Sequence, residues 1–218
     1  MSERGMIFNA EMVRALLDGR KTQTRRPIKW KQTRFTEIGE REDGSKWPWS
    51  EDAEHACDFW HPCPFGAVGD RIWVREAFRV HSRATDVATL VYKASERNSW
   101  TEQTRRVPVA VCNKPATPEK WTPSLHMPRW ASRILLEITD VRVERLNAIS
   151  EEDARAEGII DGGCLNCGEP EPCGCANPEP DATDAFAYLW QSIYGQENWN
   201  ANPWVWVIEF KRVEGGAA

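Results

Sequence analysis

The first twenty residues combine apolar and polar positions with the period of an amphipathic helix. Residues 7–19 open with a short apolar stretch and then place four apolar side chains at helical spacing: Met12, Val13, Leu16 and Leu17. Asn9 is a residue type that caps the start of a helix, and Gly19 is one that ends it. We therefore predict a helix over this segment.

Later segments carry the pattern of strands: residues 69–78, 106–111, 127–146 and 203–213. The clearest is 127–146, where apolar residues recur near every second position. A phase slip at Asp140 indicates a bulge or a bend in that strand. The pattern thus predicts short strands distributed along the whole chain.

Two further helices are predicted in the C-terminal third. Ser150 followed by Asp153 is close to a capping box, so a helix should start here and run to about Glu157, with Gly158 ending it. Apolar residues at helical spacing predict another helix over 183–194. Short strands with few helices indicate an α+β fold, and we expect a small mixed β-barrel with helices packed against it.

Three segments lack this clean periodicity and are expected to be insertions in a single domain of residues 1–218. Residues 36–68 are polar, proline-bearing and rich in tryptophan, which predicts a long ordered loop. Residues 80–120 form a second insertion, and residues 161–182 form a loop rich in glycine, proline and cysteine.

Composition narrows the class of protein without naming it. The chain has 218 residues, 41% of them hydrophobic and 28% charged, which excludes wholesale disorder, collagen and coiled coil. No window of eighteen apolar residues predicts a membrane span, and the first residues lack a secretory signal pattern. We therefore expect a cytoplasmic protein with no membrane partner.

Residues 20–34 hold seven basic side chains and no acidic one, in a chain whose net charge is −5. Such a run is usually a solvated face of the protein. The alternative is a site for an anion or a nucleic acid, in which Trp30 would offer a stacking surface. Composition alone leaves both interpretations open.

Four of the seven cysteines lie close together, in a CxxC pair and a CxC pair: Cys164, Cys167, Cys173 and Cys175. Tetrahedral zinc binds four thiolates, and a loop with so little apolar content would gain its order from a metal. We predict a structural zinc ion here and no catalytic one, because four thiolates close the coordination shell. A reduced loop without metal is the alternative.

The segment after the first helix, GRKTQTRR (19–26), resembles the GxKTxxxR signature of the ASCH domain family, which has a PUA-like β-barrel fold. Other segments agree with this resemblance: GDRIWVRE (69–76), SEEDARAEG (150–158) and VWVIEFKRV (205–213). The layout is also similar to that of prophage-borne ASCH proteins, with CPFG, HMPRWASR and NPWVWVIEF segments. The resemblance leaves out roughly residues 36–60, 80–120 and 160–182.

The resemblance implies a cleft for RNA-type ligands. Small bacterial ASCH proteins are amidohydrolases that remove the acetyl group from N(4)-acetylcytidine. By motif position, the implied catalytic residues in this chain are Lys21, Thr24 and Glu157. Further residues are expected to bind the substrate: Arg20, Arg25, Arg26, Trp30 and Glu76. Glu76, in the WVRE segment, also competes with Glu157 for the role of catalytic acid.

The chemistry of amide hydrolysis makes demands that these residue types can meet. Thr24 can supply a nucleophilic hydroxyl, but it needs a base, and Lys21 serves as one only if burial and neighbouring cations lower its pKa. In a regular strand, positions 21 and 24 face opposite sides, so they converge only if the segment is irregular. The plain alternative is a strand threonine and an exposed lysine.

Several functions remain open from the sequence. An amidohydrolase acting on an acylated nucleoside or RNA is the first, and a non-catalytic module that binds RNA or modified nucleic acid is the second. A ribonuclease of the same fold is a third, in which the basic segment would hold the phosphate.

Overall fold

The computed structural model describes residues 1–29, 36–52, 57–160 and 182–213. In chain order the elements are β1 (Glu3–Ile7), α1 (Ala10–Leu17), β2 (Gln23–Pro27), β3 (Thr36–Glu40), β4 (Lys46–Asp52), β5 (Cys57–Trp60), β6 (Arg71–Arg75), β7 (Phe78–Arg83), β8 (Val87–Tyr92), α2 (Trp100–Gln103), β9 (Thr104–Pro108), β10 (Leu135–Arg145), α3 (Glu151–Ala156), α4 (Ala182–Tyr194), α5 (Gln196–Asn200) and β11 (Trp204–Arg212). Short 3-10 turns lie at Lys93–Ser95, Ser124–His126, Arg129–Ala131 and Leu146–Ala148. None of the helices in these ranges is long and apolar enough to cross a membrane.

The predicted helices are confirmed, and their ends follow capping chemistry. At the start of α1, Oδ1 of Asn9 accepts a hydrogen bond from the backbone N–H of Met12 at 2.8 Å. After the helix the chain turns at Gly19, whose φ of 76° is a left-handed conformation that glycine adopts without strain. Ser150 caps α3 by accepting from the backbone N–H of Asp153 at 3.1 Å.

The prediction of a long loop over residues 36–68 is wrong, because this segment contains an antiparallel sheet in the order β3-β4-β5. Proline removes a backbone donor and is rare in a central strand, so the residues of this segment give little local indication of the sheet. In the structure Pro48 lies in β4, paired with Ile38, and its carbonyl still accepts from the N–H of His61 at 2.8 Å. Trp47 and Trp49 lie two positions apart in β4, so both side chains are on the same side of the strand.

The fold is mixed α+β, as the sequence predicts. One sheet has five strands in the order β1-β6-β10-β11-β2, and a third sheet has the order β7-β8-β9. Strand β1 is parallel to β6, whereas β6 with β10 and β2 with β11 are antiparallel pairs. The described strands form these open sheets, and we find no closed barrel among them.

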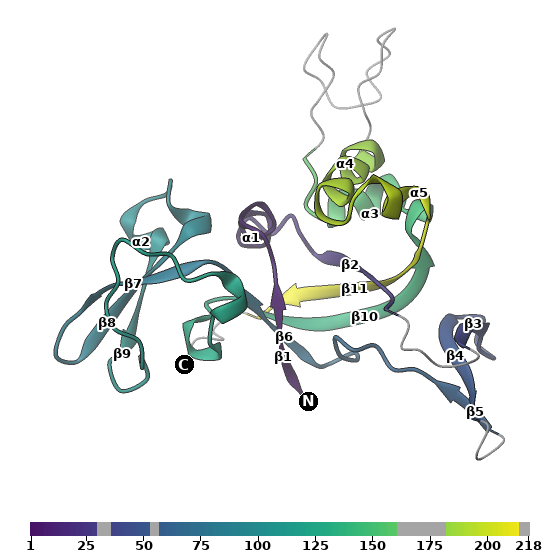
Figure 1. Ribbon diagram of the computed structural model, residues 1–218, viewed down its shortest axis with the longest axis horizontal. Coiled ribbons are helices and arrows are strands. Elements are labelled where there is room, and N and C mark those ends of the chain that lie inside the picture. The colour runs from purple at the N-terminus through teal and green to yellow at the C-terminus, as the bar shows by residue number, and fades with distance from the viewer. Residues whose placement is uncertain (30–35, 53–56, 161–181, 214–218) are drawn as a thin grey trace, which may run out of the picture. The chain divides into compact units, whose positions relative to one another are not determined.

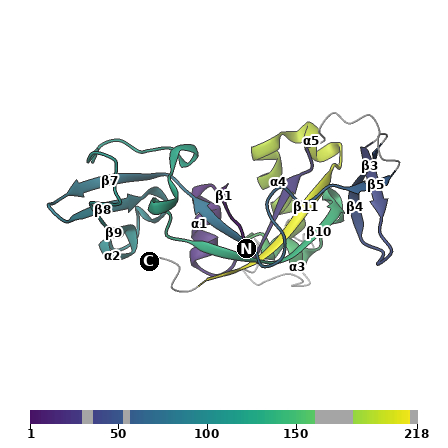
Figure 2. The ribbon, with the colours of Figure 1, turned by 90° about the horizontal axis from the view of Figure 1, so that it is seen from below.

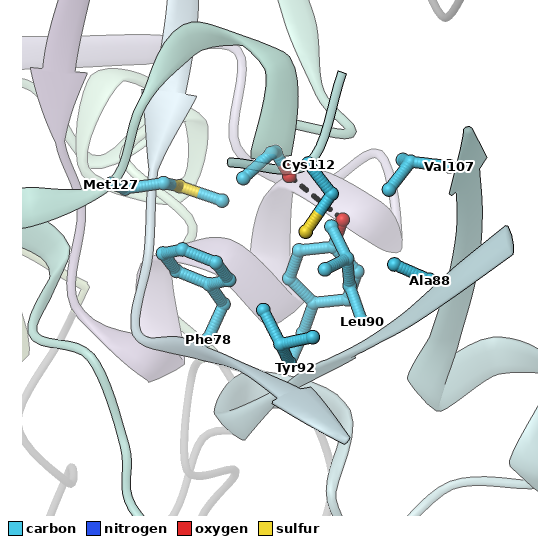
Figure 3. Close-up of a cluster of buried hydrophobic side chains, with 9 residues drawn as sticks. Phe78, Ala88, Leu90, Tyr92, Val107, Cys112 and Met127 are labelled. Carbon is cyan, nitrogen blue, oxygen red and sulfur yellow. Dashed lines mark hydrogen bonds between the residues drawn. The ribbon is translucent and has the colours of Figure 1, made fainter. Parts of the chain in front are cut away.

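The chain divides into two compact units, each made of segments that are separated in sequence. Unit 1 comprises residues 1–19, 69–138 and 211–218, and unit 2 comprises residues 20–68 and 139–210. One hydrophobic cluster of unit 1 lies on one side of the β7-β8-β9 sheet, and Figure 3 shows its side chains converging around Phe78, Leu90 and Tyr92. The hydroxyl of Tyr92 is satisfied inside this core, since it donates to the carbonyl of Ala131 at 2.8 Å.

The core of unit 2 joins helices α3 and α4 to strand β11. Its buried members come from all three elements and include Ala154, Phe186, Trp190, Val205 and Val207. Figures 1 and 2 show α4 beside β11 in two perpendicular views. This packing fixes α3 on the unit, and with it the residue that directly follows the helix, Glu157.

Candidate functional site

Lys21 lies in the short connection between α1 and β2, within unit 2. Its backbone forms an isolated antiparallel bridge with Glu157, and the N–H of Thr22 donates to the carbonyl of Ala156 at 2.8 Å. On the other side, the carbonyl of Thr22 accepts from the N–H of Phe210 at 2.9 Å. Because Lys21 precedes the regular strand, the alternation rule does not force its side chain away from that of Thr24.

Glu157 reaches this connection from the end of α3. It is the C-terminal cap of the helix, and Gly158 directly after it has a φ of 91° that turns the chain away. The side chain of Glu157 is buried, which is rare for a glutamate without a partner. A carboxylate from far downstream in the sequence is thus held beside the basic segment.

Lys21 and Glu157 form a buried ion pair. Nζ of Lys21 donates to Oε2 of Glu157 at 2.5 Å and to the carbonyl oxygen of the same residue at 2.8 Å. The other carboxylate oxygen, Oε1, accepts from the backbone N–H of Arg25 at 2.5 Å. Lys21 is 2% exposed, so the pair is removed from water. The hydrogen bonds within the pair and to the backbone have to offset the free energy of desolvating both charges.

The charge state of Lys21 reflects two opposing effects. Burial lowers its pKa from the usual 10.5, and the positive charges of Arg26 and Arg25 lower it further, whereas the Glu157 carboxylate raises it. The net result is a lowered pKa, so the ammonium loses a proton more readily than an exposed lysine does. A lowered pKa is the direction that a lysine acting as a general base requires.

A second layer of charges surrounds Arg25. Its Nη2 donates to Oδ2 of Asp153 at 2.9 Å and to Oε2 of Glu144 at 3.1 Å, and its Nη1 donates to Oε1 of Gln23. Burial raises the pKa of Asp153, but hydrogen bonds from Gln23 and Arg25 together with nearby positive charges outweigh burial and lower it. Arg142 closes the network through Glu144 and Asp153 at 2.6 and 3.2 Å.

Thr24 lies in β2 opposite Ile208 of β11 and is 1% exposed. Its side chain therefore lies in the strand that directly follows the buried pair of Lys21 and Glu157. Its neighbours in the motif are engaged: Nη1 of Arg20 donates to the carbonyl of Gly158 at 2.8 Å, and Nη1 of Arg26 lies 3.4 Å from the hydroxyl of Tyr194.

The remaining predicted site residues lie elsewhere. Glu76 belongs to unit 1, where Arg133 holds its two carboxylate oxygens at 2.8 and 3.0 Å, and burial outweighs this pairing to raise the pKa of Glu76. Trp30 and the four predicted zinc ligands, Cys164, Cys167, Cys173 and Cys175, lie outside the described residues. Within the described ranges, no group of three or more His, Cys, Asp or Glu side chains is placed to hold a metal ion.

Sequence reasoning missed the acidic partners of Arg25 in this site. Gln23 and Arg25 both point toward acidic residues, and their spacing of two residues within a strand was the available signal. Asp153 was assigned only to the first turn of a helix, and Glu144 only to a strand. Their contribution depends on β10 lying two strands from β2 in the same sheet and on the contact of α3 with β2, which local patterns do not contain.

No family model, no curated protein and no solved structure matches this chain.

Proposed function

We propose that this chain is an amidohydrolase of the ASCH type, with a PUA-like arrangement of its central strands, that acts on N(4)-acetylcytidine or a related acylated nucleoside or RNA. One observation carries the proposal: a buried lysine with a lowered pKa is held by a buried glutamate, directly before a strand that contains a buried threonine. Ionisable groups with perturbed pKa values concentrate at functional sites.

In this proposal Thr24 is the nucleophile. Its oxygen attacks the acetyl carbonyl carbon while Lys21, in its neutral form, takes the hydroxyl proton. The C–N bond then breaks, the exocyclic amine leaves with the proton returned by Lys21, and the acetyl group stays on Thr24. Water attacks this ester in a second step and releases acetate. Glu157 holds the lysine in place and stabilises its charged form between the two proton transfers.

The arginines of the motif serve the substrate. Arg26 is half-buried and would bind the nucleobase carbonyl or stabilise the developing oxyanion, since charge-assisted hydrogen bonds are stronger than neutral ones. Arg20 and Arg25 would keep the neighbouring backbone in position through their own pairs. Trp30 would stack on the base.

The internal pairing of the basic segment favours the enzyme over an open RNA groove at this place. Lys21 and Arg25 are buried against carboxylates, and Arg20 and Arg26 have partners within unit 2. Phosphate binding needs exposed, unpaired cations. A non-catalytic RNA-binding module or a ribonuclease would therefore have to use other residues than these.

The deciding experiment incubates the purified chain with N(4)-acetylcytidine and measures cytidine by chromatography. We expect product from the wild type and at least a hundredfold loss of rate in Thr24→Ala and Lys21→Met. Thr22→Ala is the matched control, because this exposed threonine two residues away should be dispensable. A folded wild type that releases no cytidine, or full activity in Thr24→Ala, would remove the proposal.

The zinc site belongs to the same proposal as a structural element. Four thiolates at Cys164, Cys167, Cys173 and Cys175 would complete a tetrahedral shell and leave no position for substrate. The ion would order the segment between α3 and α4 and take no part in hydrolysis.

A further inference from the structure

The charges of this chain are separated along its sequence. Residues 71–133 contain twelve lysines and arginines but five aspartates and glutamates, a net charge of +7. Because the whole chain has a net charge of −5, the other residues together carry −12. All of the basic segment lies within unit 1, which therefore contains a local positive region in an acidic protein.

The β7-β8-β9 sheet is the structural centre of this region. Its strands read FRVHSR, VATLVY and TRRVP, with four arginines and no acidic residue. The carboxylates of residues 78–133 lie outside the strands, at Asp86, Glu96, Glu102 and Glu119. Arginine without lysine or acid is typical of surfaces that bind phosphate through planar, bidentate contacts.

One face of this sheet packs on the core, and the opposite face is only partly covered: Val91 there is buried, whereas Arg106 is exposed. Phe78, Val80 and Leu90 alternate onto the core side shown in Figure 3. The opposite side carries what we call the arginine face: Arg79, Thr89, Val91, Thr104 and Arg106 in the strands, with His81 at the bulge of β7. Register places Arg79, Val91 and Thr104 in one row and Thr89 with Arg106 in the next.

Two tryptophans border the arginine face. The guanidinium of Arg79 lies 4.5 Å from the ring centre of Trp121, and the ring of Trp100 lies 5.1 Å from that of His81. Trp100 is 54% exposed, although an indole ring gains much from burial. Figure 1 shows its helix, α2, next to this sheet.

Several polar groups here lack internal partners. Nε of Arg79 and Nδ1 of His81 are buried without a hydrogen bond among the described residues. Arg106 is exposed and makes no ion pair in the same part of the chain. Arg25 and Arg142 of unit 2 differ from Arg79 and Arg106, because each of them forms ion pairs with neighbouring carboxylates.

We propose that the arginine face binds single-stranded nucleic acid, with Arg79 and Arg106 on phosphates and a base stacked on Trp100. Unpaired arginines beside an exposed aromatic ring are the combination that such ligands need. A membrane surface would require several exposed apolar side chains on this face, where Val91 is buried and Thr89 and Thr104 are polar. This inference does not depend on the proposed hydrolase function, since it uses different residues in a different unit.

Fluorescence anisotropy with the full chain and a labelled twelve-nucleotide single strand tests the proposal, with RNA and DNA arms. We expect Trp100→Ala to raise Kd by about fivefold or more. Arg106→Gln should weaken binding and reduce the slope of log K against log salt by about 0.7. Arg79→Gln should act in the same direction, and Arg106→Gln keeps the test valid if Arg79→Gln fails to fold.

The controls separate this site from others. Arg212→Gln removes an exposed strand arginine elsewhere and should leave Kd unchanged. Lys21→Met and Thr24→Ala should also bind normally, even if they abolish hydrolysis. Tighter binding of polyglutamate or anionic vesicles than of either oligonucleotide would overturn the proposal, as would wild-type affinity in both Trp100→Ala and Arg106→Gln.

Discussion

Lys21 is held between two effects, because burial favours its neutral form and Glu157 favours its charged form. While the lysine is charged, each unit by which folding lowers its pKa reduces the free energy of unfolding by about 1.4 kcal/mol. The unfolded chain keeps a pKa near 10.5. Between the lowered folded pKa and this value, the unfolded state binds more protons, so the stability of the protein rises with pH.

Lys21→Met should therefore change both the free energy of unfolding and the way in which it varies with pH. Methionine has a similar volume and no charge, so the free energy of unfolding of this variant should lack the rise that Lys21 contributes as pH approaches 10.5. Urea denaturation of both proteins at pH 7 to 10 measures this, and Lys29→Met, at an exposed position, is the control. Parallel stability curves for wild type and Lys21→Met would contradict the argument.

The residues of the candidate site differ in how far the sequence could identify them. The prediction of Lys21 and Thr24 rests on a resemblance of their segment to a family motif, and that of Glu157 on a short resemblance at the end of a helix. Burial of Lys21 could not be read from a run of seven basic residues, because such runs are usually solvated. The lysine is buried because its segment bonds to the end of α3 on one side and to β11 on the other, which is a tertiary effect.

At the scale of elements, strand β1 depends on a close approach to its neighbour. Gly5 pairs with Trp73 of β6, and a Cβ at Gly5 would lie 2.5 Å from the Trp73 ring. Gly5→Ala should therefore lower the free energy of unfolding by about 1–3 kcal/mol, as overpacking does. Thermal and urea unfolding measure the loss.

A double-mutant cycle shows whether the tryptophan ring is the cause. In a Trp73→Leu background the added methyl group meets a smaller side chain, so Gly5→Ala should cost much less than in the wild type. Equal costs in the two backgrounds would mean that the ring is not what the new methyl group contacts.

The cysteine-rich connection between α3 and α4 gives a prediction about metal. If zinc orders it, elemental analysis of the purified chain should find about one equivalent, and Cys164→Ser with Cys167→Ser should remove it. Cys63→Ser is the matched control, since this buried, free cysteine lies in another segment. Less than a tenth of an equivalent in the wild type would end the zinc proposal.

Elements with strong local signals were predicted well from the sequence. Helix α1 and strand β11 combine clear periodicity with capping or branched residues, and both were found within a few residues of their predicted ends. The β3-β4-β5 sheet was missed because Pro48 argues against a strand locally, and its pairing with Ile38 outweighs that preference. Strand β9 ends at Pro108, earlier than predicted, because the N–H groups of Val111 and Cys112 turn back to its carbonyl.

At the scale of the whole molecule, charge is distributed unevenly rather than mixed. The acidic residues gather outside residues 71–133, and in unit 2 they neutralise Lys21, Arg25 and Arg142. The basic residues of the β7-β8-β9 sheet have no carboxylate on their strands. Net charge alone would predict repulsion from any polyanion, whereas this distribution predicts local attraction.

This difference can be measured on the intact chain. At pH 7 and low salt we expect the protein, despite its net charge of −5, to be retained on immobilised heparin and released as salt screens the contacts. Arg106→Gln should elute at lower salt because one unpaired cation is lost from the arginine face, whereas Arg212→Gln should elute with the wild type. Passage of the wild type through heparin at low salt would mean that the acidic residues of the chain screen this face completely. If Arg106→Gln and Arg79→Gln were retained as strongly as the wild type, the arginine face would not be the binding surface. The excess positive charge of residues 71–133 would then bind heparin through residues outside the β7-β8-β9 sheet.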